Sequence, residues 1–229
     1  MEIIAKGISK RFFRKAGESN YFFAVKECDF SLPEAAVTIL TGHSGSGKTT
    51  LLSMLAGLLA PDAGLVSADG RNLYGPDDRE NSAFRGRHLA VVPQGRAVLD
   101  TLNVLDNCLL GLRLAGYEAV DSIAKAEEWL DRFEILPLRS AMPRELSGGE
   151  LRRVMLIRAL MTEAEVLFAD EPTADLDEEN TEKVLEALQT AAHQQQKTIL
   201  IVTHENEALK IADRVFRMNK GEMLPFTVK

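Results

Sequence analysis

The chain has 229 residues, of which 45% are hydrophobic and 27% are charged, so it can bury a core and has the composition of an ordinary globular protein. Its formal net charge of -7 argues against a nucleic-acid-binding surface, which usually carries a basic surplus, and we expect no nucleic-acid partner. Cys28 and Cys108 show no paired spacing, and no run of about 18 apolar residues occurs, which excludes a disulfide framework and a bilayer-spanning helix.

Short strand-like segments alternate with longer helical ones along the chain. The first 36 residues and residues 65–73 read as short strands joined by turns, which predicts a small antiparallel sheet. Later runs rich in Val, Ile and Leu are apolar on both faces, as strands buried in a parallel sheet are. These runs are residues 37–40, 89–92, 166–169, 198–202 and 214–218.

The strand signal is absent between about residues 95 and 160. Within this stretch, residues 121–133 place Ile123, Trp129 and Phe133 along one helical face. A further amphipathic helix is predicted to begin near Asp177, where acidic residues suit the positive end of the helix dipole. The alternation predicts an α/β fold with a mainly parallel sheet, into which a helical lobe is inserted.

A phosphate-binding loop, the P-loop (residues 42–49), matches G-x-x-x-x-G-K-S/T in full. The candidate nucleotide-binding residues in and after it are Gly42, His43, Ser44, Gly45, Ser46, Gly47, Lys48, Thr49 and Thr50. An apolar strand precedes the loop and a helical segment follows it, so successive backbone N–H groups would face an anion at a helix N-terminus. Lys48 would reach the β- and γ-phosphates, and the Thr49 hydroxyl would hold Mg²⁺. The loop alone does not distinguish kinases, GTPases, helicases and transporter motors.

Polar side chains follow several of the predicted parallel strands. Asp170 and Glu171 end the strand at 166–169, where Asp170 suits the shell of a hard cation and Glu171 could accept a hydrogen bond from an attacking water. Gln94 follows another strand and could coordinate Mg²⁺ or sense the γ-phosphate, and His204 follows a third. We expect these side chains to meet at one edge of the sheet.

A second glycine-containing turn, the serine–glycine turn (Ser147, Gly148 and Gly149), precedes a helix-periodic segment. Its backbone N–H groups at a helix N-terminus would form a second anion site. The alternative interpretation is a capped helix start with no ligand.

Six segments, taken in order, resemble the ABC ATPase family over nearly the whole chain. GHSGSGKTT is similar to the Walker A loop, VVPQ to the Q-loop, ELSGGE to the signature, VLFADEP to Walker B, TADLD to the D-loop and IVTHE to the H-switch. The resemblance implies a P-loop NTPase (RecA-like) core with a small antiparallel β subdomain and an inserted helical subdomain. In that division, residues 1–94 and 161–229 form the core and residues 95–160 the helical subdomain.

The resemblance also implies ATP and Mg²⁺ as cofactors and a head-to-tail homodimer or heterodimer. Each ATP would lie between the P-loop of one subunit and the serine–glycine turn of the other. The side chain stacking on adenine would be Phe12, with Phe13 as its neighbour. The resemblance assigns catalytic roles to Lys48, Gln94, Glu171 and His204, metal ligands to Thr49, Gln94 and Asp170, and nucleotide contacts to Thr50 and Asp177.

Some positions depart from the family's usual pattern. Glu150 ends the signature where Gln is more usual, and Ala174 and Asp175 replace a commoner pair of small residues in the D-loop. After Gln94, residues 95–107 lack the aromatic residue and the proline that are frequent there. That region faces the membrane partner in the family.

The segment 14–25 and the sequence ADEPT at residues 169–173 resemble those of the branch of lipoprotein-release, macrolide-export and cell-division ATPases. This implies a cytoplasmic subunit, peripheral on the cytoplasmic face of the cell membrane, that powers an integral membrane transporter subunit docked near the Q-loop and the helical subdomain. The alternative is ATP-driven transmembrane signalling or mechanical work without solute transport. A DNA- or ribosome-directed ATPase usually carries coiled-coil, zinc or tandem-domain additions, which are lacking here. The sequence leaves open the substrate, the direction of transport and the choice between homodimer and heterodimer.

Overall fold

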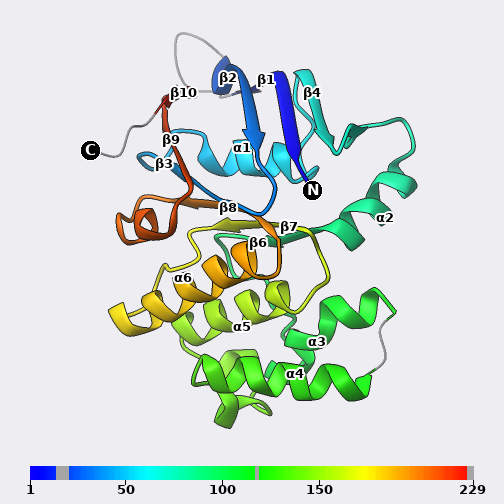
Figure 1. Ribbon diagram of the computed structural model, residues 1–229, viewed down its shortest axis with the longest axis vertical. Helices are drawn as coiled ribbons and strands as arrows, with labels where there is room; N and C mark the ends of the chain where they lie inside the picture. The colour runs from blue at the N-terminus through cyan, green and yellow to red at the C-terminus, as the bar shows by residue number, and fades with distance from the viewer. Residues whose placement is uncertain (14–20, 117–118, 226–229) are drawn as a thin grey trace.

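The computed structural model describes residues 1–13, 21–116 and 119–225, so part of the predicted insertion at 14–25 lies outside the described residues. An antiparallel sheet and the helix at 48–55 lie at one end of the molecule, a second sheet crosses its middle, the helix at 78–88 lies at its edge, and the large helices between residues 104 and 193 lie on the other side (Figure 1). This layered arrangement confirms the predicted α/β fold class.

The antiparallel sheet has four strands in the order β2-β1-β4-β5. Their bounds are Ile3–Phe13 for β1, Tyr21–Leu32 for β2, Ala63–Ala68 for β4 and Arg71–Asn72 for β5. β1 pairs antiparallel with both β2 and β4. The small antiparallel sheet predicted from the two ends of this region is confirmed.

The central sheet has six strands in the order β10-β9-β3-β8-β7-β6. Their bounds are Val37–Thr41 for β3, Leu89–Val92 for β6, Val166–Asp170 for β7, Thr198–Thr203 for β8, Arg214–Asn219 for β9 and Glu222–Pro225 for β10. All pairings are parallel except that of β9 with β10. The five predicted parallel strands are confirmed, each within one residue of its predicted end.

The helices include one that the sequence did not predict. Their bounds are Lys48–Leu55 for α1, Asp78–His88 for α2, Val104–Leu114 for α3, Ala119–Arg132 for α4, Gly148–Leu160 for α5 and Glu178–His193 for α6, with 3-10 turns at Leu136–Leu138, Pro143–Glu145 and Glu207–Ile211. Helix α2 was missed because it has no apolar stripe, and Asn81 is its only buried residue. It is stabilised at its start by Asp77, whose side chain accepts a hydrogen bond from the N–H of Glu80.

The central strands alternate between two hydrophobic clusters. In β8, Ile199 and Ile201 belong to the cluster formed with α3, α4, α5 and α6, whereas Leu200 and Val202 belong to the cluster formed with α1 and the antiparallel sheet. Both faces of this strand are therefore buried, which explains its uninterrupted apolar sequence.

The arrangement brings several chain segments to one edge of the sheet. Because β3, β7 and β8 are paired in parallel, the P-loop, Glu171 and His204 follow strands that end on the same side. Both cysteines are free. Among the described residues, no helix combines the length and the apolar character needed to cross a bilayer.

Replacing Phe133 by alanine is expected to lower the free energy of unfolding by about 3–5 kcal/mol, because a large cavity is left in the core. Phe133 is fully buried and stacks on Trp129 with ring centroids 5.7 Å apart. Urea unfolding followed by circular dichroism measures the effect. The control is Leu114→Ala, because Leu114 is 80% exposed and its loss should cost less than about 0.5 kcal/mol. Equal losses in the two variants would contradict the position of Phe133 in the core.

Candidate functional site

The P-loop lies between β3 and α1 and is braced by two other segments. Gly47 has a φ of 107°, and a Cβ at this position would lie 1.9 Å from the carbonyl oxygen of Ala24, so only glycine fits. The N–H of Gly221 donates to the carbonyl oxygen of Ser46 at 2.9 Å. Strand β2 and the turn between β9 and β10 therefore fix the loop from outside.

Lys48 points back into this loop. Its side chain is largely buried, and Nζ donates hydrogen bonds to the carbonyl oxygens of Gly42 at 2.8 Å and His43 at 3.2 Å. The ammonium group is thus held inside the curve of the loop, where it would meet an anion bound to the backbone N–H groups.

Thr49 and Asp170 are hydrogen-bonded to each other at the mouth of the P-loop. Burial raises the pKa of Asp170, whereas the hydrogen bond from Thr49 and the positive charge of Lys48 oppose that rise. A divalent cation would favour the ionised carboxylate. Thr49, Asp170 and Gln94 line the same hollow and present oxygen donors, which suit Mg²⁺.

No cluster of three or more His, Cys, Asp or Glu side chains is arranged for metal binding anywhere in the described part of the chain. A cation held by Thr49, Asp170 and Gln94 would therefore depend on hydroxyl and amide oxygens and on oxygens from a ligand. That donor set fits Mg²⁺ bound together with phosphate groups.

Glu171 has an uncommon backbone conformation, and two side chains at the end of β8 hold its carboxylate. Its φ is 50°, and its side chain is buried. Thr203 Oγ1 donates to Oε2 at 2.9 Å, and His204 Nδ1 lies 2.8 Å from Oε1. The interaction with Glu171 raises the pKa of His204. Holding a non-glycine residue at positive φ costs free energy that the surrounding structure must offset.

One hollow of about 560 Å³ joins these groups. It is lined by Phe12, Phe22, Phe23, Ala24, Ser44, Gly45, Gly47, Lys48, Thr49, Thr50, Gln94, Asp170, Glu171, His204 and Lys220. Four of these residues were not predicted from the sequence: Phe22, Phe23, Ala24 and Lys220. The aromatic run at 21–23 was the signal for the first two, since it lies opposite Phe12 in the register of β1 and β2.

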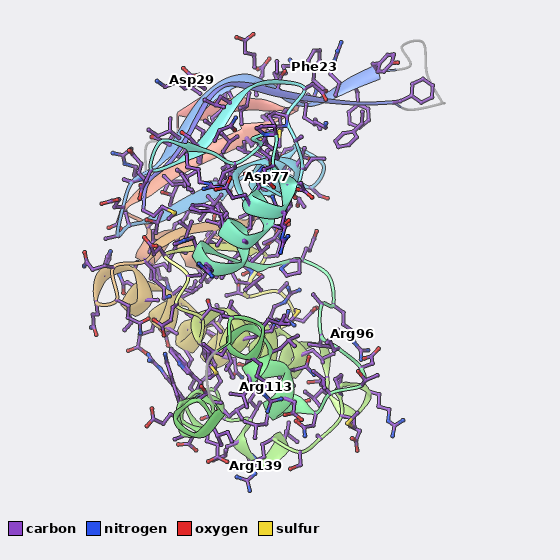
Figure 2. The ribbon with its side chains drawn as sticks, turned by 90° about the vertical axis from the view of Figure 1, so that its right-hand side faces the viewer. Phe23, Asp29, Asp77, Arg96, Arg113 and Arg139 are labelled. Atoms are coloured by element: carbon purple, nitrogen blue, oxygen red, sulfur yellow. The ribbon has the colours of Figure 1, made fainter. Side chains whose placement is uncertain are left out.

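Aromatic side chains form the end of the hollow away from the P-loop. Phe12 is 37% exposed, and its ring centroid lies 6.1 Å from that of Phe22. Phe13 instead meets Tyr21 edge-on, with centroids 5.4 Å apart, and does not line the hollow. Figure 2 shows the paired ends of β1 and β2 extending beyond the body of the molecule, with Phe23 near their base. Phe12, rather than Phe13, faces the space that also contains Lys48.

The serine–glycine turn caps α5 and lies outside this hollow. Ser147 Oγ accepts from the N–H of Glu150 at 3.3 Å, and the N–H and Oγ of Ser147 donate to Glu150 Oε2 at 2.7 and 2.8 Å. Within one chain, Ser147 is thus the N-cap of α5. The turn lines a separate hollow together with Asp175 and Asp177. A single chain does not bring its two candidate anion sites together.

The other predicted residues take various positions. Gly42 and His43 line a neighbouring hollow that also contains His204. Ser46 is buried, and its Oγ has no hydrogen-bond partner among the residues that the structure describes. Asp177 is the N-cap of α6, where its side chain accepts from the N–H of Asn180 at 2.8 Å.

Comparisons of the sequence with known proteins agree with this geometry. The ABC transporter family profile matches residues 25–174. The lipoprotein-releasing system ATP-binding protein LolD of Bacteroides fragilis is 34% identical over 200 residues, which cover 87% of this chain and 93% of that protein. The putative hemin import ATP-binding protein HrtA of Staphylococcus epidermidis is 33% identical over 224 residues, which cover 97% and 99% of the two chains.

Solved structures give the same result. The dimeric structure of MJ0796, described as a bacterial ABC transporter cassette, matches with a TM-score of 0.89 and 27% identity, covering 99% of this chain and 100% of that one. A dimeric post-hydrolysis state of the same cassette, bound to ADP and Pi, matches equally well, with a TM-score of 0.89. The chain therefore belongs to the ABC transporter family and is an ATP-binding, ATP-hydrolysing cassette.

Proposed function

We propose that two copies of this chain, or one copy and a close relative, close head to tail around ATP and drive a separate membrane-spanning transporter subunit. The observation that carries this proposal is the separation of the P-loop and the serine–glycine turn into different hollows of one chain. Each subunit then needs its partner's turn to complete its site. The similar cassette MJ0796 is described as dimeric, which supports this arrangement.

In the proposed complex, the adenine ring stacks on Phe12 and the phosphates lie in the P-loop. Lys48 turns its ammonium group from the loop carbonyl oxygens toward the β- and γ-phosphates. Thr49, Asp170 and Gln94 would hold Mg²⁺, which supplies positive charge that offsets the phosphate oxygens. Thr50 adds a contact at the start of α1.

Glu171 is the residue best placed to orient the attacking water. Its carboxylate is fixed by Thr203 and His204, so one geometry is held before the substrate arrives. Positive charge from Lys48 and the N–H groups of the partner's serine–glycine turn would offset charge that develops on the phosphoryl group. Asp177 supports that interface by capping α6 beside the turn.

We propose that the membrane partner docks beside the segment that follows Gln94, with this chain peripheral on the cytoplasmic face of the membrane. The segment is held in shape by the buried Asn107, which accepts from the N–H of Leu99 at 2.8 Å and donates to its carbonyl oxygen at 3.0 Å. Leu99 is nevertheless 46% exposed, and Arg96 lies on the connection between the central sheet and the helices below it (Figure 2). LolD and HrtA are both named for transport or release systems, which favours transport over purely mechanical signalling.

Glu171→Gln is expected to bind ATP but to hydrolyse it on the order of 10²–10⁴ times more slowly, because the water loses its hydrogen-bond acceptor. The arrested protein should accumulate as an ATP-dependent dimer, measured by size-exclusion chromatography with light scattering. Glu165→Gln, at the opposite end of β7, is the control and should behave as the parent protein. A Glu171→Gln variant that turns over normally and stays monomeric would remove Glu171 from its proposed role.

Phe12→Ala is expected to weaken ATP binding roughly 2- to 10-fold, because an aromatic contact of this kind contributes about 0.5–1.5 kcal/mol. Titration with a fluorescent ATP analogue measures the dissociation constant. Phe13→Ala is the matched control, because Phe13 is the neighbouring aromatic residue and does not line the hollow. The adenine assignment is wrong if the control loses as much affinity as Phe12→Ala.

The imidazole of His204 is expected to titrate above the ordinary histidine pKa of about 6.5, because the Glu171 carboxylate favours its protonated form. The imidazolium that forms this pair is thus fully present below the ordinary histidine pKa and is lost as pH rises through the raised pKa. Glu171→Gln should return the pKa of His204 toward its ordinary value, as measured by NMR titration. Glu165→Gln, which removes the partner of His88 at the opposite end of β7, is the matched control and should leave the pKa of His204 as it is in the parent protein. An ordinary pKa for His204 in both proteins would contradict the pairing.

A further inference from the structure

Asp175 lies in the turn between β7 and α6, directly beside the serine–glycine turn. Its φ is 67°, a conformation that aspartate, asparagine and glycine tolerate better than other residues. A Cβ on Gly149 would lie 2.8 Å from the carbonyl oxygen of Asp175, and one on Gly148 would lie 3.6 Å from its carboxylate Oδ2. The carboxylate therefore stands next to the first residues of α5.

Some backbone N–H groups of the serine–glycine turn are not used in hydrogen bonds. The N–H of Glu150 donates to Ser147 Oγ at 3.3 Å, and the N–H of Leu151 donates to the Ser147 carbonyl oxygen at 3.0 Å. Within the described ranges of the chain, the N–H groups of Gly148 and Gly149 have no acceptor. Two free amides at a helix N-terminus favour an anion, and Asp175 places a fixed negative charge beside them.

Two arginines lie near that negative charge. Arg152 is 5% exposed, and its guanidinium donates to the backbone carbonyl oxygens of residues 93 and 94 at 2.9 and 2.7 Å. Burial lowers the pKa of Arg152, and the charges of Asp175, Asp170 and Glu171 oppose that effect. Asp170 and Glu171 line the P-loop hollow, whereas the hollow of the turn is lined by Asp175 and Asp177 against one cation, Arg153, which leaves a surplus of negative charge around the turn.

Arg153 lines the hollow of the turn, and its donors are bonded to neutral groups. Its Nη1 donates to the Phe133 carbonyl oxygen at 3.0 Å and to Asn180 Oδ1 at 2.7 Å. Its positive charge lowers the pKa of Glu150 and of Asp177 as a lesser effect beside their hydrogen bonds. The single positive charge of Arg153 is thus shared between Glu150 and Asp177, and it does not balance both of them together with Asp175.

We propose that Asp175 is a tuning residue that raises the ATP concentration needed for two subunits to close, by repelling the triphosphate that the partner presents to the serine–glycine turn. The inference rests on the proposed closure of two subunits around ATP and specifies its regulation. Like charges brought together at a partly desolvated interface oppose association. The small pair that is usual in the resembling family carries no such charge, so this opposition comes from the chain's own sequence.

The test compares variants in a Glu171→Gln background, where hydrolysis does not consume the nucleotide. Asp175→Asn keeps the size of the side chain and its tolerance of positive φ while removing only the charge. The ATP concentration for half-maximal dimer, measured by analytical ultracentrifugation, is expected to fall roughly 3- to 10-fold. The difference should shrink at high salt, because screening weakens the repulsion.

Two further variants test whether the effect comes from the charge of Asp175. Glu178→Gln makes the same change in net charge one turn away, outside the hollow of the serine–glycine turn, and should leave the midpoint unchanged. Asp175→Gly is a second charge-removing variant that accepts positive φ, and it replaces Asp175→Asn if the latter unfolds. Thermal unfolding of each variant separates loss of charge from loss of structure.

The outcomes distinguish this inference from the proposed function. If the Glu171→Gln parent does not dimerise with ATP, the proposed function fails. If the parent dimerises and the folded charge-removing variants close at the same or a higher ATP concentration, the Asp175 inference is overturned while the dimer stands. A lowered midpoint that is insensitive to salt would also overturn it, because repulsion would not be the cause.

Discussion

The parallel pairing of β3, β7 and β8 is the constraint on which the rest of the structure depends. Because these strands end on one side, Lys48, Glu171 and His204 come from three distant parts of the sequence to one hollow. The pairing is stable because both faces of each strand are buried, one against the helices and the other against the antiparallel sheet. The groups at the edge are polar, and Glu171 has a strained backbone conformation, so their positions depend on this apolar support.

Much of this could be predicted from the sequence, where local patterns were strong. The apolar runs predicted the central strands, and the P-loop motif placed Lys48 between a strand and a helix. Helix α2 was missed because its sequence has no apolar stripe and it is stabilised by its cap. The positions of Lys220 and Arg152 could not be predicted either, because both depend on long-range packing: one lines the hollow from the β9–β10 turn, and the other holds the backbone beyond β6.

The two candidate anion-binding turns of the chain differ in how their charges are balanced. The P-loop holds a cation, Lys48, whose donors are satisfied by loop carbonyl oxygens and can turn to phosphate. The serine–glycine turn is instead lined by Asp175 and Asp177 and bonded to Glu150, against the single cation Arg153. In the proposed dimer, an isolated subunit would bind nucleotide more readily at the first turn than at the second. This asymmetry would make closure depend on nucleotide bound by the partner.

The most direct test of this account is a structure of the protein with Mg²⁺ and a non-hydrolysable ATP analogue. The account predicts two subunits related head to tail, with Ser147 of one within hydrogen-bond distance of the γ-phosphate held by Lys48 of the other. An assembly in which nucleotide fills the P-loop while the serine–glycine turn still faces solvent, with Ser147 bonded only to Glu150, would contradict it.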